Sequence, residues 1–124
     1  MTIERKVLLV EDSGVTRMQV EDLLREHFDA HVIEAENGAE GWNKLAQETD
    51  IELIVTDIEM PEMDGVEFIR KVRGSDEFAF LPVLVMTTLA QIKQRDDALN
   101  AGADAFIQKP VTLEALQSML EDVW

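Results

Sequence analysis

The stretch that decides the fold is VLLVED, residues 7–12, in which four consecutive apolar residues lead into two acids. A short, continuous apolar run is typical of a strand that is buried on both faces of a sheet. Apolar runs recur at 83–86 and 105–107, and residues 31–35 and 51–55 also read as strands. The sequence therefore predicts five short strands, most of them deeply buried.

Segments of helical period follow each of these strands. Ser13, Asn37 and Thr112 are placed to cap three helices, and two further helices are expected over 66–73 and 92–100. Strands that alternate with helices indicate a parallel sheet covered by helices on both faces. Since crossovers between parallel strands are right-handed, only a few doubly wound topologies remain.

Composition limits the function classes. The chain has 124 residues, no cysteine, and 26 acids against 11 bases, which gives a net charge of −15. One domain without disulfides or thiolate metal sites is expected, and direct binding to nucleic acid or anionic membranes is disfavoured. The sequence contains neither an apolar stretch of membrane-spanning length nor a secretory signal, which favours the cytoplasm. Two interpretations of the acids stay open: a solvated surface, or a cluster that holds a divalent cation.

The residues that end the strands have the character of a chemical site. In doubly wound sheets, ligands bind outside the carboxyl ends of the strands. These ends carry Glu11 and Asp12, then Asp57, Thr87 and Lys109. Three close carboxylates need a counter-charge, and Mg²⁺ suits a site of oxygen ligands with open water positions. The plainer alternative is that each residue is only the first polar residue of a loop.

Four segments resemble the receiver domain of two-component response regulators, the CheY-like family. They are VLLVEDS at 7–13, VTDIEMPEMDG at 55–65, VMTT at 85–88 and AGADAFIQKP at 101–110. The resemblance covers essentially the whole chain and implies one receiver domain over residues 1–124. It also implies a flavodoxin-like (βα)5 three-layer α/β sandwich with strand order 2-1-3-4-5.

The same resemblance implies a phosphorelay function. Asp57 would be the phosphoacceptor, and the phosphoryl donor would be a phosphohistidine of a sensor histidine kinase or a histidine phosphotransfer protein. Mg²⁺ would be held by Glu11, Asp12, Asp57 and the backbone carbonyl of Glu59. The domain would be a signalling module that assists its own phosphorylation and dephosphorylation, not an enzyme acting on other substrates.

Three further positions carry expectations from the family. Thr87 and Lys109 would contact phosphoryl oxygens, and the Lys109–Pro110 bond is expected to be cis. Thr87 and Phe106 would form the switch that changes the surface of the fourth helix, fifth strand and fifth helix. The Phe106 ring is expected to favour its inward rotamer, because an exposed phenyl ring costs apolar hydration. Glu59 is expected to lie beside the site, within reach of Lys109.

Two other functions fit parts of the pattern. A phosphatase of the haloacid dehalogenase class would use Asp57-Ile58-Glu59 with Mg²⁺, but that class places its acids at the first strand and needs a cap. A flavin-binding module would need a hydroxyl-rich loop after the first strand, where Glu11 and Asp12 would repel a phosphate. The downstream target, which is a separate protein or a fused output domain, is left open by the sequence.

Overall fold

The computed structural model describes residues 5–123, which form one parallel five-stranded sheet in the order β2-β1-β3-β4-β5. The strands are β1 (Arg5–Val10), β2 (Ala30–Ala35), β3 (Ile51–Asp57), β4 (Val83–Thr87) and β5 (Ala105–Gln108). The helices are α1 (Gly14–Phe28), α2 (Gly38–Gln47), α3 (Gly65–Arg73), α4 (Ile92–Ala101) and α5 (Leu113–Val123). The predicted fold class and strand order are confirmed.

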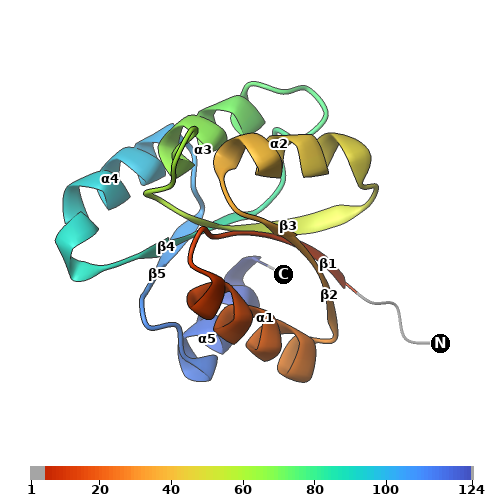
Figure 1. Ribbon diagram of the computed structural model, residues 1–124, viewed down its shortest axis with the longest axis vertical. Helices are drawn as coiled ribbons and strands as arrows, with labels where there is room; N and C mark the ends of the chain where they lie inside the picture. The colour runs from red at the N-terminus through yellow and green to blue at the C-terminus, as the bar shows by residue number, and fades with distance from the viewer. Residues whose placement is uncertain (1–4, 124) are drawn as a thin grey trace.

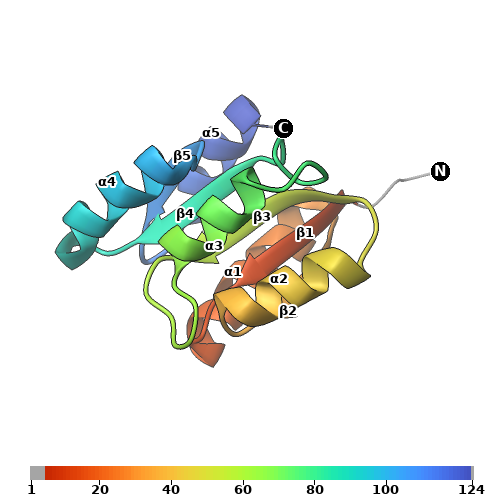
Figure 2. The ribbon, with the colours of Figure 1, turned by 90° about the horizontal axis from the view of Figure 1, so that it is seen from above.

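The helices cover the sheet on both faces, which makes three layers (Figure 1). Helices α1 and α5 lie on one face, where Val20, Leu24 and Leu116 join a buried cluster. Helices α2, α3 and α4 run side by side over the other face (Figure 2), and Phe68 and Ile69 belong to the cluster beneath them. Residues at the centres of the strands alternate between these two clusters, which explains why consecutive positions there are apolar.

The helix ends follow the predicted capping residues. The side chain of Ser13 accepts a hydrogen bond from the Thr16 N–H, and the Asn37 side chain accepts one from the Glu40 N–H. Gly102 ends α4 with a φ of 122°, a conformation that favours glycine. One element was not predicted. It is a short 3₁₀ turn, η1 (Leu89–Gln91), which precedes α4.

The loop after β3 folds tightly against the end of that strand. The N–H of Gly65 donates to the carbonyl of Ile58 over 2.6 Å. A Cβ atom at Gly65 would collide with the carbonyl oxygen of Asp57, so no larger residue fits without displacing the backbone. The turn thereby fixes the peptide that carries Asp57 at the carboxyl edge of the sheet.

Candidate functional site

Three carboxylates meet at the carboxyl ends of β1 and β3. One oxygen from each of Glu11, Asp12 and Asp57 lies within 4.8 Å of the other two. Glu11 and Asp57 are buried, with 0% and 4% of their surface exposed, whereas Asp12 is exposed. The structure therefore brings together the acids that the strand-end argument selected.

Lys109 enters this cluster from the end of β5. Its Nζ lies 3.0 Å from Glu11 Oε1 and 3.0 Å from Asp57 Oδ1. Its backbone N–H donates to the carbonyl of Thr87 over 2.6 Å, which ties the ends of β4 and β5 together. The Lys109–Pro110 bond is cis, as predicted.

The charges in this cluster shift the pKa values of its members. Burial, helped by the neighbouring Asp57 carboxylate, raises the pKa of Glu11 to about 8, and Lys109 only partly opposes this. Burial lowers the pKa of Lys109, but its hydrogen bonds and attraction to Glu11 and Asp57 outweigh burial and raise that pKa overall. One ammonium is thus too little positive charge for the acids around it.

The residues present fit a hard divalent cation. Glu11 Oε2 is buried and has no hydrogen-bond partner among residues 5–123. When Glu11 is ionised, this buried oxygen without a donor is costly, and a cation bound between Glu11, Asp12 and Asp57 would remove that cost. Carboxylate oxygens are the ligands that Mg²⁺ prefers.

The two oxygens of Asp57 have different surroundings. Oδ1 accepts a hydrogen bond from the Ile58 N–H over 2.8 Å and also faces Lys109. The carboxylate is thereby oriented from two sides. Both of these donors lie at Oδ1.

The other predicted residues take different positions. Thr87 ends β4 and is buried, with 3% of its surface exposed. Glu59 is exposed and accepts a hydrogen bond from Gln94 Nε2 over 3.2 Å, while Lys109 pairs with Glu11 and Asp57. Among residues 5–123, the ion pairs of Lys109 are with Glu11 and Asp57, so the contact with Glu59 that the sequence suggested is not found. Phe106 is half-buried against the core under α2, α3 and α4.

Sequence reasoning missed two contacts of the fourth-helix region. Gln91 is buried, and its side-chain oxygen accepts a hydrogen bond from the Thr88 N–H over 2.9 Å, which holds the loop after Thr87. The guanidinium of Arg95 lies 4.5 Å from the centre of the Phe106 ring, so the half-buried ring is covered by a cation. The sequence signal for these contacts was the run of polar residues at the start of α4. Helical periodicity alone does not indicate which partners such residues contact.

Comparison with known proteins decides the family. The sequence profile described as "Response regulator receiver domain" matches residues 7–121. The chain belongs to the response regulator receiver domain family. It is 36% identical to the chemotaxis protein CheY homolog of Campylobacter jejuni over 118 residues, which are 95% of this chain and 91% of that protein.

Solved receiver structures agree with this assignment. The chemotaxis response regulator CheY4 of Vibrio cholerae superposes with a TM-score of 0.87 at 32% identity, covering 98% of this chain and all of that one. The receiver domain of a sensor histidine kinase from Pseudomonas aeruginosa superposes with a TM-score of 0.86 at 26% identity, covering 98% of each chain. That protein has a magnesium ion coordinated in its active site cleft. Membership of this family sets aside the flavin-binding and phosphatase alternatives.

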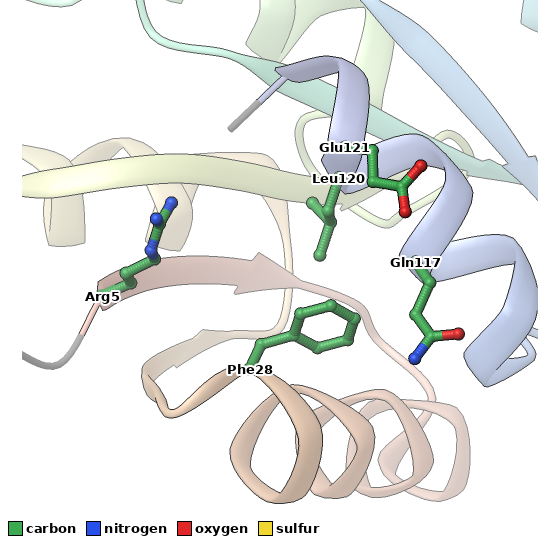
Figure 3. Close-up of a pocket in the computed structure, with 5 residues that line it drawn as sticks. All are labelled: Arg5, Phe28, Gln117, Leu120 and Glu121. Carbon is green, nitrogen blue, oxygen red and sulfur yellow. The ribbon is translucent and has the colours of Figure 1, made fainter.

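The receiver domain also has a hollow away from the acidic cluster. A cavity of about 470 Å³ lies between α1 and α5, near the start of β1 (Figure 3). Its lining residues are Arg5, Phe28, Gln117, Leu120 and Glu121. None of the predicted site residues lines it.

Over residues 5–123, no helix has both the length and the apolar character needed to cross a bilayer.

Proposed function

We propose that Asp57 receives a phosphoryl group from a phosphohistidine, and that this transfer switches the domain. The observation that carries the proposal is the position of Asp57 at the end of β3, oriented by Ile58 and Lys109 beside two further acids. A carboxylate oxygen of Asp57 attacks phosphorus and forms the acyl phosphate. The N–P bond breaks, and the donor imidazole leaves and takes up a proton.

Two side chains of this site would neutralise the transferred group. The transition state spreads negative charge over the equatorial phosphoryl oxygens, so charge neutralisation and positioning dominate catalysis. The Lys109 ammonium donates to one of these oxygens, because it already faces the acceptor carboxylate. The Thr87 hydroxyl donates to another once the phosphoryl group is in place.

Mg²⁺ is the proposed cofactor. Its ligands would be the carboxylates of Glu11, Asp12 and Asp57 and the backbone carbonyl of Glu59. Bound there, Mg²⁺ would supply the positive charge that stabilises the phosphoryl oxygens. Support comes from the orphaned Glu11 Oε2 and from the related receiver domain that coordinates magnesium.

The proposed output is a change in the surface of α4, β5 and α5. Thr87 moves toward the phosphoryl group, and Phe106 follows into the vacated space. The partners would be a sensor histidine kinase or a histidine phosphotransfer protein, together with a downstream protein or a fused output domain. Residues 1–124 would act as a single receiver domain in the cytoplasm, where these partners exchange phosphoryl groups.

The phosphoacceptor is tested by Asp57→Asn, with Asp64→Asn as the matched control. Asp64 lies in the same motif, but its side chain caps α3 by accepting from the Glu67 N–H, a role that Asn also performs. With acetyl phosphate as the phosphodonor and Mg²⁺ present, we expect a base-labile phosphoryl label on wild type and on Asp64→Asn. Asp57→Asn should carry none. A label of equal yield on Asp57→Asn would place the acceptor elsewhere.

A further inference from the structure

A basic side chain of α1 holds the backbone between the two acids that follow β1. Arg17 Nη1 donates a hydrogen bond to the carbonyl oxygen of Glu11 over 2.8 Å. On the opposite side, the Glu11 N–H donates to the carbonyl of Ala35 over 2.9 Å. Arg17 therefore holds the oxygen of the peptide that joins Glu11 to Asp12. Strand β2 holds the N–H of the peptide before it.

The guanidinium of Arg17 is itself anchored on the neighbouring strand. Its Nε lies 3.4 Å from Glu34 Oε1, and its Nη2 lies 4.0 Å from Glu36 Oε1. Only 18% of the Arg17 side chain is exposed. Arg17 thus connects the end of β1 to the end of β2 and to the residue that follows it.

Asp12 depends on this connection for its direction. Its carboxylate is exposed, and among residues 5–123 no hydrogen bond or ion pair holds it. The orientation of the side chain is therefore set by the backbone on either side of it. Ser13 caps α1 on one side, and the Glu11 carbonyl bound by Arg17 is on the other.

We propose that Arg17 is a positioning residue for the magnesium site, which aims Asp12 at the cation by fixing the Glu11 carbonyl. The inference rests on the magnesium site proposed above. Only arginine offers a planar fork that reaches a carbonyl and two carboxylates at once, whereas the lysine ammonium is a single point of donation. Lysine at this position should therefore not replace arginine.

Charge alone predicts the opposite effect. Arg17 is a cation close to a cation site, so removal of its charge would leave Mg²⁺ binding stronger or unchanged. Positioning predicts weaker binding, because partners that orient metal ligands typically change metal affinity by tenfold or more. The sign of the change in affinity therefore separates the two roles.

The test is calorimetric titration of Mg²⁺ into wild type, Arg17→Met, Arg17→Lys and Arg25→Met. Methionine keeps the long apolar stem of arginine and removes the donors. Arg25 is the matched control, because it lies on the same helix but pairs with Glu21 across one helical turn. We expect about tenfold weaker Mg²⁺ binding in both Arg17 variants. The affinity of Arg25→Met should equal that of wild type.

Amide NMR spectra of the same samples establish that each variant is folded. If Arg17→Met does not fold, Arg17→Lys decides the question, because it retains the charge and most of the stem. Equal or tighter Mg²⁺ binding in a folded Arg17 variant would overturn the positioning role and leave the magnesium site intact. Wild type that binds no Mg²⁺, with Asp12→Ala behaving identically, would overturn the magnesium site and this inference together.

Discussion

Glu11 is the residue whose charge state most affects the site. It is fully buried, one of its oxygens has no donor, and its pKa lies near 8. Near neutral pH the carboxyl group therefore holds a proton in the metal-free protein. A cation that binds there must displace this proton, which couples Mg²⁺ affinity to pH.

Mg²⁺ affinity should rise between pH 6 and pH 9. The proton on Glu11 competes with the metal below the pKa of about 8 and no longer competes above it. Affinity should increase by about tenfold per pH unit at most, since one proton is exchanged. Calorimetry in two buffers of different ionisation enthalpy would measure both the affinity and the proton released.

Glu11→Gln supplies the control for this pH dependence. Glutamine retains the size of the side chain and cannot titrate, so the Mg²⁺ affinity of the variant should be weak and nearly flat over the same range. If Mg²⁺ affinity rose with pH equally steeply in wild type and Glu11→Gln, the titrating group would be another residue.

Glu11 also affects the stability of the metal-free protein. Its folded pKa is raised above the ordinary value of 4.5, so the protonated form favours the folded state. This stabilisation is complete below about pH 4.5 and is lost as pH rises through 8. Bound Mg²⁺ would offset the loss, because it compensates the ionised carboxylate.

Among the structural elements, the turn between β3 and α3 constrains the acceptor most. Gly65→Ala should destabilise the fold by roughly 2–4 kcal/mol, since its Cβ would collide with the Asp57 carbonyl oxygen. Gly14→Ala is the matched control, because the nearest atom to a Cβ there is 4.0 Å away in the Arg17 side chain. Denaturant unfolding measures both variants. Gly65→Ala with the stability of Gly14→Ala would show that the turn can relax.

The sequence predicted most helix ends because those ends rest on local hydrogen bonds. Ser13 and Asn37 each bond an N–H three residues further on, which needs no knowledge of the tertiary structure. The turn η1 was missed because it depends on Gln91 reaching back to Thr88 in the packed protein. Helical periodicity carries no signal for such a turn.

For the whole molecule, the alternation of strands and helices along the sequence predicted a parallel sheet, but it did not predict the strand order. Several doubly wound orders share the same alternation, so the order 2-1-3-4-5 followed from family resemblance alone. The acids and Lys109 were predictable because parallel strands bring their carboxyl ends to one edge. The contacts of Arg17, Gln94 and Arg95 were not predictable, because they depend on how each helix is rotated against its neighbours.

In the proposed switch, phosphorylation of Asp57 is sensed at Phe106, which lies on β5 opposite Val85 of β4, two residues before Thr87, and beneath Arg95. A ligand shifts such an equilibrium only through contacts that differ between the two states. Here the contacts would be those of Thr87 and Lys109 with phosphoryl oxygens. Thr87→Ala should therefore keep the chemistry at Asp57 and weaken its coupling to Phe106.

The most direct measurement is amide NMR of the domain with Mg²⁺ before and after addition of beryllofluoride, a stable mimic of the phosphoryl group. In wild type we expect shifts at Asp57, Thr87 and Lys109 that extend to Phe106 and Arg95. In Thr87→Ala the shifts near Asp57 should remain, and those at Phe106 should shrink. Shifts confined to the loops around Asp57 in wild type would contradict the switch and would indicate a domain that only accepts and releases phosphate.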